Sequence, residues 1–169
     1  MKKIILPFLS LVFLAACNNS SENPEDKKDS SGTSVSHDNM NHGGGGNMAV
    51  PELPAVPEGA KVFFKNLKEG AIISSPFKVE MGVNVIKIDT AGPVVAGYGH
   101  HHLFINAEDS LVAGKMVPTD SSHIHFGKGQ TEYELKLTPG KYKLTLQFAD
   151  GLHRSYGEKL SSTVNVVVK

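Results

Sequence analysis

The sequence of 169 residues has no tryptophan, a single cysteine and a formal net charge of zero. A single cysteine has no partner for a disulfide within the chain. The balanced charge and the lack of a basic stripe argue against nucleic-acid binding. The sequence also lacks the Gly-x-Ser-x-Gly motif of serine hydrolases, and the glycine-rich residues 127–131 lack the spacing of a phosphate-binding loop. We interpret this segment as a tight turn between strands.

One extended apolar run is present, over residues 4–16, and it follows two lysines. A membrane-spanning helix needs about 20 apolar residues, so the run is too short to be one and is typical of a secretory signal peptide. It ends in Leu14-Ala15-Ala16-Cys17, which resembles the lipobox of bacterial lipoproteins. We therefore predict that residues 1–16 are removed and that lipid on Cys17 anchors the mature chain to a membrane. This places the protein in the bacterial cell envelope, either periplasmic or surface-exposed.

Residues 17–59 have little apolar content and many small, polar and charged side chains. Such a composition cannot bury enough surface to offset the entropy of ordering, so we predict a disordered, flexible tether after the lipidated cysteine. The tether contains four side chains that could serve as auxiliary metal ligands, and thioethers favour Cu(I). These are His37, Met40, His42 and Met48. The alternative is a low-complexity polar spacer that binds nothing.

Residues 60–169 are long enough for one domain with its own core. Short apolar runs separated by turn residues recur, and several alternate apolar and polar side chains with a period of two. That pattern predicts an all-β domain, namely an immunoglobulin-like antiparallel β-sandwich. The Pro139-Gly140 turn before Tyr142 resembles the corner of such domains, where a tyrosine hydroxyl bonds back to the preceding turn. The expected strands are 61–65, 77–81, 83–88, 101–105, 133–137, 142–148 and 163–168.

Histidines are concentrated in two short segments of this domain. His100 and His102 form one pair, His123 and His125 form another, and His153 follows near the end. On a strand, residues two apart point to the same face, about 6–7 Å apart, so each pair can direct two imidazoles at one ion. Imidazole suits Cu(II) and Zn(II), and intrinsic affinity favours copper. We therefore predict a metal site formed by His100, His102, His123 and His125, with His153 as a further ligand or as a residue that supports the ligands. Copper is the first choice and zinc the second.

Two further residues are expected to support this site. His101 is expected on the same face of its strand as the apolar Leu103 and Ile105, opposite to His100 and His102. We therefore predict that it is a buried hydrogen-bonding group that supports the ligands. Asp150 precedes His153 by three residues and could orient one imidazole through its carboxylate. Because ligand imidazoles must be neutral, binding should weaken below about pH 6.5, the ordinary histidine value.

Particular motifs of the domain resemble an exported bacterial family, the domain of unknown function 4399. They are Gly-His-His-His-Leu at residues 99–103 and His-Phe-Gly-Lys-Gly-Gln-Thr-Glu at residues 125–132. The Pro-Gly corner, the Asp-x-x-His of Asp150 and His153, and the segments 66–71 and 75–77 are similar too. The family often has a histidine where this chain has Tyr142. The resemblance implies a family but no activity.

Three functions remain open on the sequence alone. The first is an extracytoplasmic metal-binding module. The second is a non-catalytic adhesion or envelope-assembly sandwich whose histidines are structural. The third is a metalloenzyme, which we do not favour, because copper–zinc superoxide dismutases need a bridging histidine and an aspartate ligand at spacings that this chain does not match. No protein partner is indicated beyond the membrane reached through the lipid on Cys17.

Overall fold

The structure is a computed structural model that describes residues 49–169. Cys17, the signal peptide and the tether residues His37, Met40, His42 and Met48 lie outside this range. The described residues form nine strands and one 3-10 helix, with no α-helix, which confirms the all-β prediction. No helix among residues 49–169 is long and apolar enough to cross a membrane. The elements are β1 (Lys61–Phe64), β2 (Ala71–Ile73), β3 (Phe77–Asn84), β4 (Lys87–Ile88), β5 (Tyr98–Ile105), β6 (His123–His125), β7 (Glu132–Leu135), β8 (Gly140–Ala149), η1 (Glu158–Leu160) and β9 (Ser161–Val168).

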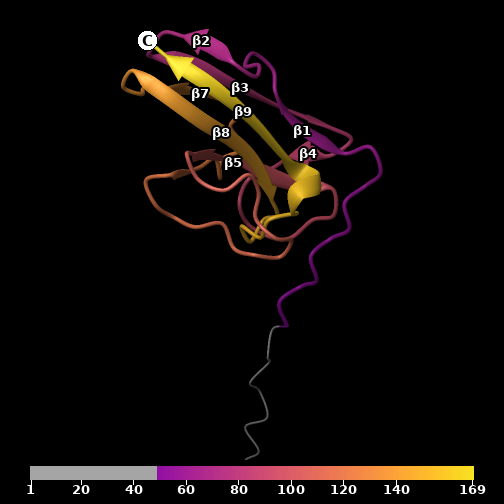
Figure 1. The fold of residues 1–169 in the computed structure, drawn as a ribbon. Coiled ribbons are helices and arrows are strands. Elements are labelled where there is room, and N and C mark those ends of the chain that lie inside the picture. The colour runs from indigo at the N-terminus through magenta and orange to yellow at the C-terminus, as the bar shows by residue number, and fades with distance from the viewer. Residues whose placement is uncertain (1–48) are drawn as a thin grey trace, which may run out of the picture. The chain divides into compact units, whose positions relative to one another are not determined.

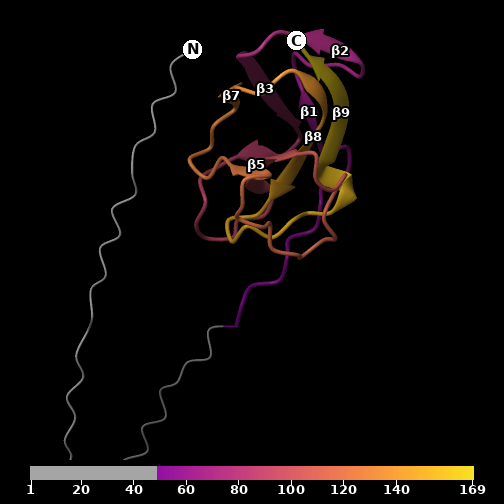
Figure 2. The same ribbon diagram turned by 60° about the vertical axis from the view of Figure 1, so that its left-hand side comes forward.

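The strands form two sheets that face each other as a sandwich (Figures 1 and 2). The smaller sheet has the order β1-β3-β7. The larger has the order β2-β9-β8-β5-β4, with β6 paired to the other part of β5. Most pairs are antiparallel, but β2 pairs with β9 and β4 pairs with β5 in parallel. The predicted β-sandwich is confirmed, and its two short edge strands β2 and β4 add parallel pairs to the otherwise antiparallel sheets.

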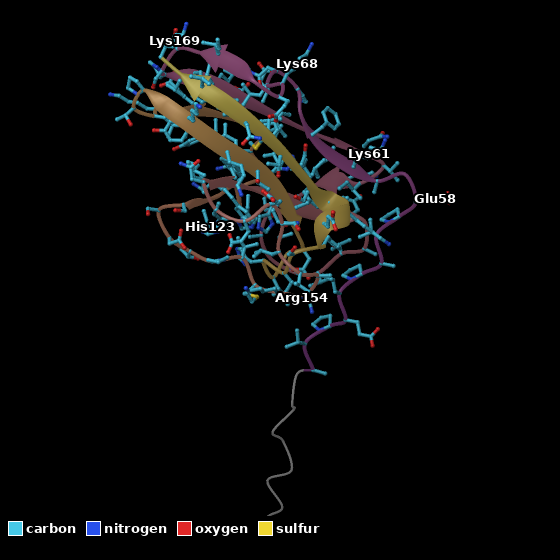
Figure 3. All side chains as sticks on the ribbon, in the orientation of Figure 1. Glu58, Lys61, Lys68, His123, Arg154 and Lys169 are labelled. Carbon is cyan, nitrogen blue, oxygen red and sulfur yellow. The ribbon has the colours of Figure 1, made fainter. Side chains whose placement is uncertain are left out.

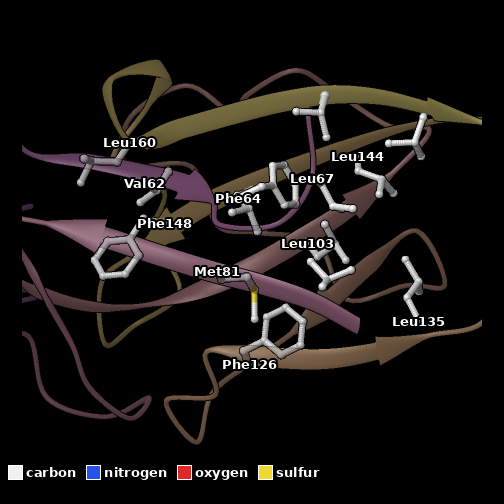
Figure 4. Packing of buried hydrophobic residues seen from close by; sticks show 14 of the residues in the cluster. Val62, Phe64, Leu67, Met81, Leu103, Phe126, Leu135, Leu144, Phe148 and Leu160 are labelled. Carbon is white, nitrogen blue, oxygen red and sulfur yellow. The ribbon is translucent and has the colours of Figure 1, made fainter. Parts of the chain in front are cut away.

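The core lies between the two sheets. Val79 and Met81 of β3 and Leu144 and Leu146 of β8 are fully buried within one apolar cluster. Figure 4 shows Met81 and Leu144 in this cluster. Leu135 of β7 joins the same cluster. These residues alternate with polar side chains along their strands, as the period-two pattern predicts. Burial of this apolar surface is the main force that holds the two sheets together.

The corner before β8 has the predicted tyrosine contact. The hydroxyl of Tyr142 donates a hydrogen bond to the backbone carbonyl of Thr138 at 3.0 Å, and the Thr138 hydroxyl lies 3.0 Å from the Tyr142 hydroxyl oxygen. Because the hydroxyl bonds across the Pro-Gly turn, the turn and the start of β8 are held in one arrangement. The interpretation of residues 137–142 as an immunoglobulin-type corner is consistent with this geometry.

The packed chain begins before the boundary expected from the sequence. Leu53 and Val56 lie against the core cluster. Arg154 donates hydrogen bonds to the backbone carbonyls of Pro51 at 2.6 Å and Glu52 at 3.5 Å. The sequence analysis placed residues 49–59 in the tether because residues 17–59 as a whole have little apolar content and many small, polar and charged side chains. In the structure, the two apolar side chains and one guanidinium attach this segment to the domain.

Strand β5 buries both of its faces, and this arrangement creates the candidate site. Leu103 points into the core between the sheets, whereas Phe104 packs in a second, smaller cluster with Leu111 and Val117 of the long loop after β5. His100 and His102 share the face of Phe104, because they lie four and two residues before it, respectively. The site therefore lies on the side of the large sheet that carries the long loops, near His123 and Arg154 in Figure 3.

A candidate metal centre of four histidines

Four imidazoles meet beside the end of β5. His100 and His102 come from β5, His125 from β6 and His153 from the loop after β8. Their six ring-centroid separations run from 4.7 to 6.0 Å. Nitrogen atoms of His100, His102 and His125 lie within 4.8 Å of one another, and Nε2 of His153 lies 3.1 Å from Nε2 of His125. The arrangement could hold one metal ion.

Strand register brings three of these residues together. β5 and β6 are antiparallel, with His102 directly opposite His125. His100 lies two residues before His102 on β5 and points to the same face of the sheet. The loop around Gly127 also matters, because a Cβ at this position would collide with Cε1 and Nε2 of the His125 imidazole. Glycine therefore leaves the space that this ring occupies.

His153 is placed by a tight turn at the end of β8. The carboxylate of Asp150 accepts hydrogen bonds from the backbone N–H groups of Leu152 at 3.0 Å and Arg154 at 2.9 Å. The N–H of His153 donates to the carbonyl of Asp150 at 2.9 Å. His153 itself has a φ of 66°, a left-handed conformation that is uncommon for residues other than glycine. Such conformations persist where surrounding contacts impose them, and they concentrate at functional sites.

The two β5 histidines of this group are buried without hydrogen-bond partners. His100 is 0% exposed and His102 is 2% exposed, and none of their four ring nitrogens has a partner. A buried polar group without a partner costs about 1–3 kcal/mol. Buried groups of this kind are rare in native proteins and call for an explanation. A metal ion that accepts their lone pairs would supply the missing interaction.

The electrostatics of the site keep these imidazoles neutral. Burial, together with the neighbouring His125 and His153, lowers the pKa of His100 to about 4, although Asp150 opposes the shift. Burial and the nearby histidines lower the pKa of His102 to about 2. The pKa of His125 is also lowered, by burial and by His153. Neutral imidazole is the form that can bind a metal, and the lowered pKa values of His100 and His102 keep these rings neutral below the ordinary histidine pKa.

His123 does not join the four imidazoles, and the expected five-histidine set is corrected on this point. Its Nδ1 lies 2.7 Å from Asp120 and its Nε2 lies 3.1 Å from Glu108, so carboxylates occupy both ring nitrogens. Its ring packs against Phe104. Burial lowers the pKa of His123, but the hydrogen bonds to Asp120 and Glu108 outweigh this effect and raise it. His123 is therefore paired with acids, and it differs from His125 although both lie on β6.

The two supporting residues also differ from expectation. His101 is fully buried, but it makes no ring hydrogen bond and lies edge-on to Phe148, with centroids 5.4 Å apart, on the core side of β5. Its pKa is lowered to about 4, first by burial and then by His100 and Lys65. Asp150 bonds no imidazole, because its second oxygen pairs with the Arg154 guanidinium at 2.6 Å. Asp150 instead shapes the turn that carries His153.

Some of the contacts around His123 and His125 can be anticipated from the sequence, and others cannot. Asp120 precedes His123 by three residues and accepts a bond from the Ser122 N–H at 2.8 Å, a local turn that the sequence suggests. Glu108 lies 15 residues from His123, in a loop whose path no short pattern describes. The space that Gly127 provides for His125 also depends on the folded geometry.

Comparisons with known proteins agree with the two specific motifs of the sequence. The model of a family described as a domain of unknown function, DUF4399, matches residues 79–169, which is more than half of the chain. The model of a prokaryotic membrane lipoprotein lipid attachment site matches residues 1–18. The protein is therefore a lipid-anchored protein of the cell envelope. No curated protein and no solved structure matches the chain significantly.

Proposed function

We propose that this chain, which belongs to the family of the domain of unknown function DUF4399, binds a transition-metal ion at the membrane surface. The ligands are His100, His102, His125 and His153, and the ion is copper in the first place and zinc in the second. One observation carries the proposal. Four imidazoles from three separate segments converge, and the two most buried of them have no other partner for their ring nitrogens.

The spacing of the nitrogens suits a four-coordinate ion. Neighbouring nitrogens at about 2.0–2.1 Å from a four-coordinate ion lie about 2.9–3.4 Å apart, and opposite nitrogens of a square-planar ion about 4.1 Å apart. The 3.1 Å between Nε2 of His125 and Nε2 of His153 falls within this range. The nitrogens of His100, His102 and His125 lie within 4.8 Å, so binding would draw them inwards by small side-chain rotations.

The donor set favours copper over harder cations. All four ligands are imidazoles, and the described residues place no carboxylate in the group. Calcium and magnesium prefer oxygen ligands, whereas imidazole suits copper and zinc, and intrinsic affinity is highest for copper. The tether adds His37, Met40, His42 and Met48, which we propose as auxiliary ligands that deliver or shield the ion. The lipid on Cys17 keeps this chemistry outside the cytoplasm.

The test compares two matched double variants of the mature lipoprotein, purified in detergent. His125→Asn with His153→Asn removes two imidazoles from the domain, and His37→Asn with His42→Asn removes two from the tether. Each protein is titrated with Cu(II) and with Zn(II) against a chromophoric chelator of known affinity. We expect the domain variant to lose its tightest site, and the tether variant to retain it.

Equal affinity in the two variants and the unaltered protein would overturn the proposal. The histidines would then be structural, and a non-catalytic envelope or adhesion module would become the leading function. His125 is exposed and His153 is half-buried, so asparagine at these positions should leave the fold intact. Circular dichroism of each variant checks this. For a copper-loaded sample, electron paramagnetic resonance should show hyperfine coupling to several imidazole nitrogens only when both histidines are present.

A further inference from the structure

A hollow of about 720 Å³ lies directly beside His153. Its walls are mostly apolar and include Val50, Pro93 and Leu152. Met116 lines it too, with 57% of its surface exposed, whereas Met81, the other methionine among residues 49–169, is fully buried. An exposed methionine is unusual, because methionine is mostly found inside folded proteins. The hollow thus presents one soft sulfur donor next to one ligand of the proposed metal centre.

Backbone pairing holds Met116 and His153 in fixed relation. Residues 115–117 run antiparallel to residues 153–155, with Met116 opposite Arg154. The N–H of Val117 donates to the carbonyl of His153 at 2.9 Å, and the N–H of Ser155 donates to the carbonyl of Lys115 at 2.8 Å. These hydrogen bonds hold the two segments side by side along one wall of the hollow, with Met116 opposite Arg154, the residue next to His153.

The charge in the hollow is largely compensated. Arg154 lines it, but its guanidinium pairs with the fully buried Asp150 at 2.6 Å and bonds the carbonyl of Pro51. The surface of the hollow is therefore mostly apolar, and Met116 and His153 are among the residues that line it. Thioether is a soft ligand that selects Cu(I), and imidazole also binds copper. Neither group suits a hard, strongly hydrated cation such as magnesium.

We propose that this hollow is a capture site for monovalent copper, in which the Met116 thioether and the His153 imidazole are the first protein ligands that the ion meets. The inference rests on the proposed metal-binding function and deepens it, because it assigns the oxidation state that enters and the side from which it enters. His153 belongs to both sites, so an ion held by Met116 and His153 lies next to His125, whose Nε2 is 3.1 Å from that of His153.

The test is an anaerobic titration of the mature lipoprotein with Cu(I) against a Cu(I)-specific chelator. Met116→Leu is compared with the unaltered protein and with a control that carries Met40→Leu and Met48→Leu, which removes two thioethers from the tether. Leucine conserves volume and apolar character, so it removes the sulfur alone. We expect Met116→Leu to weaken Cu(I) binding by about tenfold or more, the size of effect known for groups that support metal sites. Its Cu(II) affinity should stay unchanged.

X-ray absorption on the Cu(I)-loaded protein gives a second readout. We expect copper–sulfur scattering that persists in the tether control and disappears when Met116→Leu is added to that control. Unchanged Cu(I) affinity in Met116→Leu, or sulfur scattering that disappears only in the tether control, would overturn the capture site. Failure of the proposed four-histidine site would give a different result. The protein with His125→Asn and His153→Asn would then bind Cu(II) as tightly as the unaltered chain.

Discussion

The Nε2 atoms of His125 and His153 lie 3.1 Å apart, although 28 residues separate them in the sequence. In the metal-free protein, one ring must donate its proton to the other, since two lone pairs at this distance repel. With an ion between them, both lone pairs point at the same charge. The contact therefore joins β6 and the turn after β8 in either state, and it marks the open side of the candidate site.

Gly127→Ala should weaken metal binding without unfolding the domain. A Cβ at residue 127 would collide with the His125 imidazole, so the ring must leave its place. Gly127 has no positive φ, so alanine can adopt the backbone conformation. We expect Cu(II) affinity to fall by about tenfold or more, as for other losses of ligand orientation. Chelator competition measures the change.

Gly129→Ala is not a suitable control, because Gly129 has a φ of 72°. Gly140→Ala is better, since its Cβ meets Tyr142 at ordinary contact distances and lies away from the histidines. This variant should bind copper as the unaltered protein does. If both alanine variants bind equally well, the space at residue 127 does not govern the position of His125.

His101→Leu should stabilise the domain and leave metal binding intact. Both ring nitrogens of His101 are buried without a partner on the core side of β5, and a group of this kind costs about 1–3 kcal/mol. Leucine has a similar size and no polar atoms to satisfy. We expect a gain in the free energy of unfolding, measured by urea denaturation, of the order of 1 kcal/mol.

The matched variant is His102→Leu, one residue along the strand. It removes the same kind of unpaired imidazole, but from the side of the four-histidine group. It should abolish tight copper binding, and His101→Leu should not. A loss of copper binding in His101→Leu would show that His101 acts in the site, contrary to its place in the core.

The metal-free domain should lose stability as the pH falls below about 6.5, the unfolded-state value for histidine. The pKa values of His100 and His101 are lowered to about 4 and that of His102 to about 2. Between the lowered and the ordinary values, the unfolded chain binds more protons than the folded one, so protons favour unfolding. Each residue then contributes up to about 1.4 kcal/mol per pH unit. Urea unfolding at several pH values measures this.

His123 should show the opposite dependence. Its pKa is raised, so its pairing with Asp120 and Glu108 contributes stability that is present in acid and is lost as the pH rises through the folded value. The destabilisation caused by His123→Gln should therefore be larger near about pH 5 than near about pH 8. An equal effect at the two pH values would argue against an ion pair at His123.

Cys17→Ser should abolish lipid attachment. The lipid attachment site covers residues 1–18, and a serine hydroxyl cannot replace the thiol that accepts the diacylglycerol. We expect an uncleaved precursor that incorporates no labelled fatty acid. Ser20→Ala, three residues further on, is the control and should be processed and labelled as the unaltered chain is. Labelling of the Cys17→Ser protein would contradict the assignment.

The sequence by itself determined the features that depend on local patterns. The lipobox at Leu14 to Cys17 is read by a peptidase from adjacent residues, so no fold is needed to recognise it. Period-two alternation at Leu144, Leu146 and Phe148 predicted both the strand and its buried face, since alternate residues of a strand point to opposite sides. The same rule placed His100 and His102 on one face, opposite to His101.

Tertiary structure alone decided which histidines meet. His125 reaches His102 because the antiparallel register places the two residues opposite each other, and a shift of one residue would have reversed the faces. His153 joins them through a turn shaped by Asp150 and a left-handed backbone. His123 pairs instead with Glu108. Glu108 comes from a loop whose path depends on packing against Phe104. Such contacts link distant segments, so their geometry follows from the packing of the whole domain and not from any local pattern.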